Sequence, residues 1–441
     1  MFRRNHFIWW PCAVLALAAG SATADTITGT SVPRSAADST APATALTTLK
    51  QAFDAAWLRQ PEAQSQQLRL DAAAAQQQAA TRWTAEPLAL ELSSKSDRLN
   101  QNLGRDETVA GISIPLWLPG ERSRTIAVAD AQARAAAGRV RAAQLRTAAS
   151  VREAYWAWER ARVDHALAGE LLAYAQQLAQ DVGKRVRAGD LARADQHQAD
   201  GAQAQAEATL AESAGVLASA SQRLQTLTGL VPPNAANAAN AAGGAAPAVA
   251  EPVPAALAEP TGPDASHPVL AELQDSAALA QHTAALTAVQ TRANPELTLA
   301  TSRDRGALDE AYQHSITLGI RIPLGADSRN QAKRASAQAD ALEAEVQARL
   351  VQDRLQGEVQ AARVGLASAQ TRVDAARLRA RLARESRAFF QKSFQAGETD
   401  VPTRLRMERE AMDAERQAAR AGIDLAAAQS DLRQALGLLP Q

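Results

Sequence analysis

The sequence predicts an α+β membrane protein built from two structural repeats, in which long helices accompany four short strands. Three observations predict this class. Only 4% of the 441 residues are aromatic, and much of the chain is alanine, glutamine, arginine and leucine, which favours closely packed long helices. A set of short motifs recurs at a nearly constant spacing. Four short segments alternate aliphatic residues with small or polar ones, as strands do.

The recurring motifs indicate an internal duplication. Five sites occur twice, 207 or 208 residues apart: Pro61 and Pro268, Pro87 and Pro295, Pro115 and Pro323, Ala188-Gly189 and Ala396-Gly397, and Gly229 and Gly437. Five sites at nearly one offset are typical of a duplicated unit. We expect the first repeat at residues 44–230 and the second at residues 265–438.

The segments outside the repeats have their own composition. Residues 1–24 begin with two arginines, continue as an apolar run and end in an Ala-x-Ala pattern, which predicts a signal peptide. Cys12, the only cysteine, lies in this segment, so we expect no disulfide, thiol or lipid anchor in the mature chain. Residues 25–43 are expected to be a flexible arm. The Pro/Ala-rich residues 231–264 are expected to link the repeats without forming a helix or burying much surface.

Each repeat is expected to contain a helix, two strands, a very long helix, a glycine turn and a returning helix. Helices are predicted at residues 44–59, 62–84, 121–187, 191–229, 267–292, 328–394 and 401–437. A helix of about 67 residues extends roughly 100 Å. The two shorter helices beside it sum to nearly the same length, so we expect them to stack end to end along it. Ordinary coiled coils are the alternative for any single helix.

Strands are predicted at residues 87–96, 107–116, 295–302 and 313–324. The last of them places Ile316, Leu318 and Ile320 on one face and Arg321 on the other. This division is typical of transmembrane barrel strands, whose lipid-facing residues are apolar and whose lumen-facing residues are polar. Glu91 and Arg321 are therefore expected to face a lumen. A small soluble sheet is the alternative that alternation alone leaves open.

Other sequence features bear on how the strands would enter a membrane. Trp83 and Trp117 flank the strands, where an interfacial aromatic belt would lie. No stretch after the signal approaches the run of about 20 apolar residues that a spanning helix needs. Four strands cannot close a membrane barrel, since the smallest have about eight. A homotrimer would supply twelve strands and is the simplest closure.

The turns have residue types that suit their positions. Gly189 and Gly397 are expected to cap the ends of the long helices, and Asp190 and Asp400 to cap the starts of the helices that follow. The turns from strand to long helix are expected at Pro115, Gly120, Pro323 and Gly325.

Catalytic and ligand-binding patterns are not evident in the sequence. The histidines are scattered without metal-ligand spacing, and no catalytic triad stands out, so we expect no enzyme activity, cofactor or bound metal. The 47 basic and 47 acidic residues balance, which predicts no nucleic-acid partner.

This order of motifs resembles the TolC-like outer-membrane factors, the family of outer membrane efflux proteins. The resemblance covers residues 44–438. It rests on Ile-Pro-Leu at 114–116 and 322–324, the two Ala-Gly turns, Leu-Thr-Gly-Leu at 227–230 and Leu-Gly-Leu at 436–438.

The resemblance implies a homotrimer in the cell outer membrane, with a twelve-stranded β-barrel in outer-membrane lipid and a long periplasmic α-helical barrel. It implies a passive exit duct of a tripartite efflux system that exports small toxic compounds or metal cations. The partners would be an inner-membrane pump and a periplasmic adaptor (membrane fusion protein). The adaptor would contact the distal turns at Arg187, Gly189, Asp190, Gln395, Gly397 and Glu398.

Two other functions remain open at this point. A duct of a type I protein secretion system would have the same fold. A periplasmic coiled-coil adaptor or structural protein would share the signal peptide and the long helices, although alternating strands would serve no purpose in a purely structural coiled coil. Many family members carry a lipidated N-terminal cysteine, which this chain lacks, so the barrel alone would have to anchor it.

Overall fold

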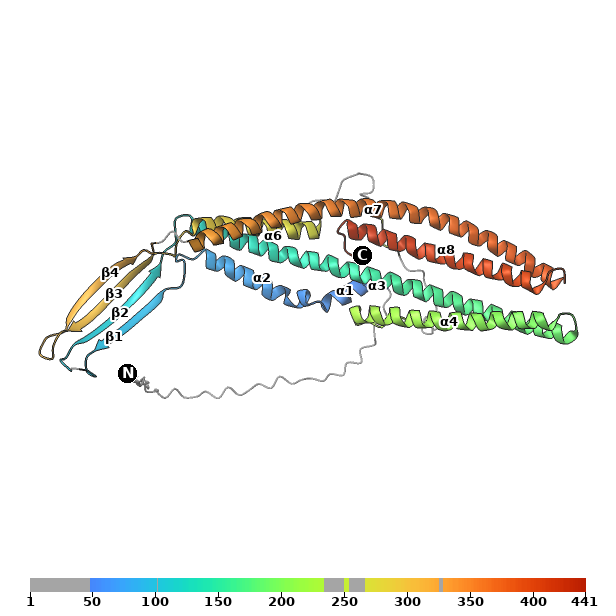
Figure 1. Cartoon of the computed structure of the whole chain (residues 1–441), viewed down its shortest axis with the longest axis horizontal. Coiled ribbons are helices and arrows are strands. Elements are labelled where there is room, and N and C mark those ends of the chain that lie inside the picture. Colours follow the sequence, from blue (N-terminus) through green and yellow to red (C-terminus); the bar gives the residue numbers. More distant parts are fainter. Residues whose placement is uncertain (1–47, 101, 234–249, 254–265, 325–327) are drawn as a thin grey trace, which may run out of the picture. The chain divides into compact units, whose positions relative to one another are not determined.

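The computed structural model describes residues 48–100, 102–233, 250–253, 266–324 and 328–441. The predicted signal peptide and arm, most of the predicted linker, and Gly325 lie outside these residues. The elements follow one another in this order (Figure 1): α1 (Leu49–Leu58), α2 (Pro61–Ala80), β1 (Ala89–Ser96), β2 (Asp106–Pro115), α3 (Glu121–Ala188), α4 (Arg193–Thr228), α6 (Pro268–Val289), β3 (Glu296–Arg305), β4 (Gln313–Arg321), α7 (Ser328–Gln395) and α8 (Val401–Ala435).

The two halves of the chain repeat one set of elements. The helices α3 and α7 each have 68 residues, and the returning helices α4 and α8 have 36 and 35. The glycines that end these pairs share a left-handed backbone, with φ of 87° at Gly189 and 81° at Gly397. Glycine adopts this conformation without steric cost, which is why both long helices stop at their Ala-Gly motif. The duplication therefore extends from the motifs to the backbone.

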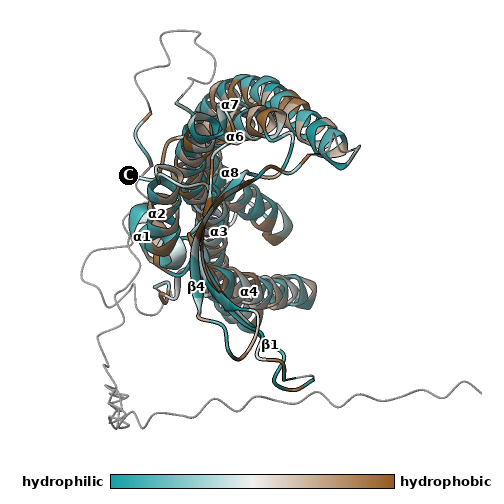
Figure 2. Ribbon diagram, turned by 90° about the vertical axis from the view of Figure 1, so that its left-hand side faces the viewer, coloured by the Kyte–Doolittle hydropathy of each residue, from teal (hydrophilic) through white to brown (hydrophobic). Residues whose placement is uncertain are grey.

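The helices pack side by side in a fixed order. Near the strands α3 lies between α2 and α6, and α7 packs on α6. Farther from the strands α3 packs on α4 and α8, and α7 packs on α8 (Figure 1). Viewed end-on, these helices form a curved layer rather than a closed bundle (Figure 2). The outermost members of the layer are α7 on one side and α2 and α4 on the other.

The four strands form one antiparallel sheet in the order β1-β2-β3-β4. The central pair joins the repeats, because β2 of the first repeat pairs with β3 of the second, with Ile112 opposite Leu299. The outer strands β1 and β4 each have one unpaired edge in the single chain. No helix packs on either face of the sheet among the described residues.

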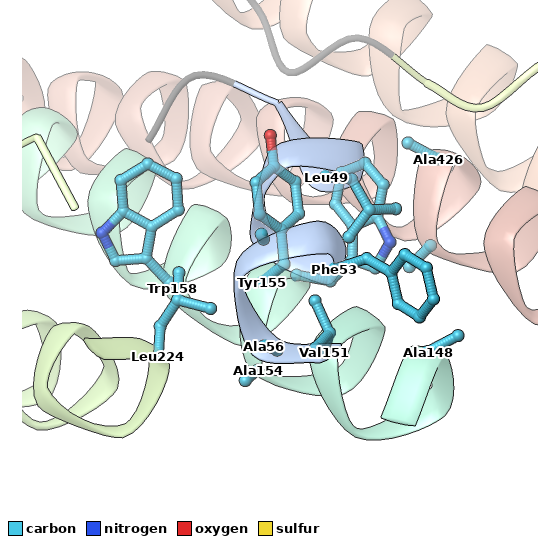
Figure 3. Close-up of a cluster of buried hydrophobic side chains, with 13 residues drawn as sticks. Leu49, Phe53, Ala56, Ala148, Val151, Ala154, Tyr155, Trp158, Leu224 and Ala426 are labelled. Carbon is cyan, nitrogen blue, oxygen red and sulfur yellow. The ribbon is translucent and has the colours of Figure 1, made fainter. Parts of the chain in front are cut away.

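The largest hydrophobic cluster lies where the stacked short helices meet. Leu49 and Phe53 of α1 pack against Val151, Tyr155 and Trp158 of α3 (Figure 3). Leu224 of α4 and Ala426 of α8 complete the cluster. Among the described residues the second repeat shows no counterpart of α1, which packs on α2, α3 and α4 of the first repeat.

Two short helices end earlier than the sequence predicts. The helix α2 stops at Ala80 rather than residue 84, and α6 stops at Val289 rather than residue 292. Prolines 87 and 295 stand shortly after these ends, and a proline disfavours helical backbone in the residue before it. The chain leaves the helix a few residues earlier and enters the strand extended.

The assignment of Asp190 as a helix cap is wrong. The helix α4 begins at Arg193, and the Asp195 carboxylate accepts a hydrogen bond from the Ala192 N–H at 3.1 Å. The matching assignment in the second repeat is correct, since the Asp400 carboxylate accepts a hydrogen bond from the Thr403 N–H at 3.2 Å. The two turns thus differ in how the next helix starts.

The expectation that the linker buries little surface is wrong at Glu251, which is 3% exposed. Both carboxylate oxygens accept hydrogen bonds from Arg152 of α3, at 2.9 and 2.8 Å. The Nε of Arg433 in α8 donates to the same carboxylate at 3.2 Å. A residue of the inter-repeat segment therefore binds both repeats.

Candidate functional site

The sheet separates two kinds of side chain according to its register. Paired residues of neighbouring strands point to the same face, so each face consists of rows that cross the strands. The apolar face, as we call it, comprises Leu90, Leu92, Ala110, Ile112, Ile114, Leu297, Leu299, Ile316, Leu318 and Ile320. Figure 2 is viewed from the sheet end, so the strands lie in front of the helices.

The apolar face is uncovered in the single chain. Leu90 is 78% exposed, Leu318 is 71% exposed and Ile316 is 79% exposed. Soluble proteins rarely leave a contiguous aliphatic surface of this kind in water. A soluble sheet would need a helix or a second sheet over this face, and no described helix supplies one. The alternative of a small soluble sheet therefore does not fit.

The opposite face is polar and includes both residues predicted to face a lumen. Glu91 lies on this face in β1, opposite Gly111. Arg321 lies on it in β4, where its guanidinium stands 3.7 Å from the Glu296 carboxylate. The Ser302 and Ser315 hydroxyls hydrogen bond there at 2.6 Å. Glu91 and Arg321 are at opposite edges of the sheet and do not contact each other.

The buried carboxylate of Glu121 stabilises the joint between β2 and α3, and no sequence pattern identified this residue. The strand ends at Pro115, and Gly120 turns the chain with φ of 80°. The buried Glu121 carboxylate accepts hydrogen bonds from the Leu118 N–H at 2.9 Å, and from Gln290 and Asn294 at 2.7 and 3.0 Å. It thereby ties the first joint to the end of α6. An acidic residue in a first helical turn is common, so nothing local marked it.

Only one of the two tryptophans fits the expected interfacial belt. Trp83 is 80% exposed beside the strand end. Trp117 is half-buried, and its indole N–H is buried without a hydrogen-bond partner among the described residues. Trp117 is therefore a packing residue at the joint. In the second joint Pro323 lies two residues after the end of β4.

The far ends of the long helices form two turns with the same backbone hydrogen bond. The Asp190 N–H donates to the Arg185 carbonyl at 2.9 Å, and the Glu398 N–H donates to the Ser393 carbonyl at 3.0 Å. All six residues predicted for adaptor contact are exposed on these turns: Arg187, Gly189, Asp190, Gln395, Gly397 and Glu398. We call them the tip residues. They offer charged side chains and backbone groups to a partner.

A cluster behind the tip residues brings both turns to the same end. The Phe394 ring of α7 lies between the guanidinium groups of Arg185 of α3 and Arg404 of α8, at 4.9 and 4.5 Å from the ring centroid. The Arg185 guanidinium also donates to the Phe394 carbonyl at 3.2 Å. The Arg185 contact holds the first hairpin on the second, whereas the Arg404 contact lies within the second hairpin. Arg185 and Phe394 are 209 residues apart, which is why sequence patterns missed their contact.

A buried carboxylate lies in the same region. Glu408 of α8 has its carboxylate 3.4 Å from the Arg387 guanidinium. Burial raises the pKa of Glu408 above its ordinary value, and the nearby arginines offset only part of that effect. Burial, followed by the Glu408 charge, raises the pKa of the Tyr174 hydroxyl, which accepts a hydrogen bond from Arg404 at 3.2 Å.

Other kinds of site are not found in the part of the chain that the structure describes. No group of three or more histidine, cysteine, aspartate or glutamate side chains there could hold a metal ion. No helix within the described ranges is at once long enough and apolar enough to cross a membrane.

The profile of a known family matches the first repeat. Residues 52–230 match the family described as outer membrane efflux protein. The first repeat therefore resembles this family. The resemblance seen in the motifs is thereby confirmed for the first repeat, and it supports the predicted location in the outer membrane with a periplasmic extension. No curated protein sequence matches the chain.

Solved structures show the same fold over nearly the whole chain. CusC, whose structures concern folding and transmembrane channel formation, superposes with a TM-score of 0.71 at 19% identity, covering 89% of this chain and 92% of CusC. The outer membrane protein VceC of Vibrio cholerae gives 0.70 at 17% identity, covering 88% and 96%. The open MtrE outer membrane channel of Neisseria gonorrhoeae gives 0.67 at 17% identity, covering 88% and 89%. The predicted fold class is confirmed.

Proposed function

We propose that this chain is one third of a passive outer-membrane duct, through which a tripartite system exports small toxic compounds or metal cations. The observation that carries the proposal is the four-stranded sheet, which has an uncovered apolar face and two unpaired edges. A lipid bilayer is the medium in which an uncovered aliphatic face is stable. Unpaired strand edges are not stable in a bilayer, so the sheet must pair with other copies.

The helices favour the same assembly. The layer ends in α7 on one side and in α2 and α4 on the other, so that a second copy would bring unlike edges together. Such head-to-tail contacts form a ring when the rotation closes. Large apolar side chains are exposed at 14-residue intervals along α7, at Leu350, Val364 and Leu378. Multiples of seven are the spacing of a coiled-coil seam, which supports α7 as the surface that meets the next copy.

The tip residues support docking of a periplasmic adaptor. The strands leave one end of the long helices, and both exposed turns lie at the other end (Figure 1). With the sheet in the outer membrane, the turns lie deepest in the periplasm, where an adaptor carried by an inner-membrane pump could reach them. The duct needs no chemistry of its own in this arrangement.

A pair of lysine substitutions on neighbouring residues tests the placement of the sheet in the membrane. Leu318→Lys puts a charge on the apolar face, which costs about 2–4 kcal/mol near the middle of a bilayer. We expect this variant to be lost from the outer-membrane fraction. Thr317→Lys puts the same charge on the polar face, shared with Glu91 and Arg321, and should insert normally. Equal insertion of both variants would show that neither face meets lipid.

Growth of a deletion strain tests export and identifies the substrate class. The strain and its complemented control are compared on toxic metals, dyes and antibiotics. Sensitivity that the gene reverses would support efflux, whereas no difference would favour protein secretion. Arg187→Glu and Glu398→Lys, placed at the two turns, should lower resistance while the amount of protein in the outer membrane stays unchanged. Full resistance in the combined variant would exclude these residues as adaptor contacts.

A further inference from the structure

The apolar face ends abruptly on the side of the sheet away from the helices. The last aliphatic row runs through Leu92, Ala110, Thr301 and Ile316. The next row on the same face consists of Ser94, Thr108, Arg303 and His314, all exposed. A step of two residues along a strand covers about 7 Å. The surface therefore changes from hydrocarbon to hydrogen-bonding groups within one step across all four strands.

We infer that this row, with Arg305 and Tyr312 beside it, binds phosphate groups of lipid headgroups in the outer leaflet. The inference rests on the proposed placement of the sheet in the outer membrane. The helices leave the sheet from its other end, so the row lies at the outer boundary of the hydrocarbon layer. Headgroups with their phosphates occupy that level of a membrane.

We call Arg303, Arg305 and Tyr312 the outer rim. Contacts at the end of the sheet hold its two arginines in place. The Arg303 guanidinium stacks on the Tyr312 ring at 3.9 Å from its centroid, and the Arg305 guanidinium lies at 4.8 Å from the same centroid. Arg305 also donates from Nε to the Gly104 carbonyl at 3.0 Å. Arginine stacked on an aromatic ring keeps its N–H edge available, and that fork matches phosphate oxygens. The rim thus presents two oriented guanidinium groups.

Neither arginine forms an ion pair with a carboxylate of the described residues. Asp106, which lies opposite Arg305 in the register, is 3.7 Å from the Arg98 guanidinium and accepts a hydrogen bond from the Tyr312 hydroxyl at 3.4 Å. Their positive charge remains available for an anion outside the chain.

The two faces of the sheet differ in net charge at this level. The neighbouring row on the polar face contains Lys95, Glu107, Asp304 and Gln313, in which two carboxylates outnumber one lysine. A sheet end that was merely solvated would have no reason to divide its charges by face. On the lipid-facing side Arg303 and Arg305 outnumber Asp106, so the net positive charge faces membrane phosphates and the net negative charge faces the lumen.

Lipid binding by the purified trimer tests the inference. The probes are vesicles containing lipid A that either keeps its phosphates or has had them removed, and the protein is wild type or Arg303→Gln/Arg305→Gln. We expect the wild type to retain the phosphorylated lipid preferentially. The double variant should lose at least about tenfold in binding, the effect of one charge-assisted hydrogen bond. Lys95→Gln removes a cation at the same level on the polar face and should bind as the wild type does.

The outcomes separate this inference from the proposed function. If the double variant stays trimeric in the outer membrane and binds phosphorylated lipid as well as the wild type does, the phosphate site is wrong and the duct stands. An equal loss in Lys95→Gln would also overturn the site. If the wild type is not trimeric in the outer membrane, the proposed function itself fails.

Discussion

Glu408 shows how a single buried carboxylate makes the far end of the helices sensitive to pH. Its pKa is raised, so the folded chain holds the proton more tightly than the unfolded chain does. The stability that this group contributes is therefore fully present below its ordinary pKa. It is lost as the pH rises through the raised value in the folded state.

The variant Glu408→Gln keeps this position neutral at every pH. We expect hydrogen exchange in the first turns of α8 to slow at pH 7.5 relative to the wild type, and to depend less on pH above about 4.5. Glu410→Gln, on an exposed position of the same helix, should behave as the wild type does. Faster exchange in Glu408→Gln at pH 7.5 would mean that the Arg387 ion pair outweighs the cost of burial.

At the scale of elements, the contact of Glu251 with Arg152 and Arg433 joins α3 and α8 of different repeats. All three side chains are buried. The Arg152 guanidinium reaches the Leu438 carbonyl at 3.1 Å as well, and Arg433 reaches the Pro252 carbonyl at 2.9 Å. Such a group is stable while every member is paired, but removing one charge leaves the others buried without compensation.

We predict that Glu251→Gln lowers the free energy of unfolding by about 3–5 kcal/mol, because two guanidinium groups stay buried opposite a neutral amide. Chemical unfolding of the purified protein, followed by loss of helical signal, measures this. Glu272→Gln is the matched control, because the Glu272 carboxylate lies 3.0 Å from the guanidinium of Arg146, whose side chain is largely exposed. That change should cost less than about 1 kcal/mol. Similar stability in both variants would contradict the proposed role of Glu251.

The elements that sequence predicted well are those set by local backbone chemistry. Proline and glycine act on their own neighbourhood, so Pro115, Gly189 and Gly397 locate the turns without reference to the rest of the chain. Alternation in β4 likewise assigns its faces from adjacent residues. The fold followed because the same local signals occur twice and in the same order.

The contacts that sequence missed all depend on distant partners. Arg152 and Glu251 are 99 residues apart, and Glu121 and Asn294 are 173 apart. Each residue is an ordinary charged or amide side chain in its own segment, and only the packing of one repeat on the other makes it a buried contact. The wrong cap at Asp190 has a different, local cause, because Asp195 accepts the hydrogen bond at this N-terminus from within the helix.

At the scale of the whole molecule, the single chain leaves three features incomplete. The strands β1 and β4 have unpaired edges, the apolar face has no cover, and the helical layer ends in α7 on one side and in α2 and α4 on the other. A head-to-tail ring in a membrane completes all three at once. Three copies give twelve strands, which exceeds the roughly eight that the smallest membrane barrels use.

Cysteine cross-linking between β1 and β4 in isolated outer membranes tests this ring most directly. Cys12, in the predicted signal peptide, is the only native cysteine, so introduced pairs would have little competition. One cysteine in place of Leu92 is combined in turn with single cysteines along Gln313–Arg321. For the matching register we predict products of two and three chains and none larger. Products that stop at two chains, or no cross-linking in any register, would contradict the trimeric duct.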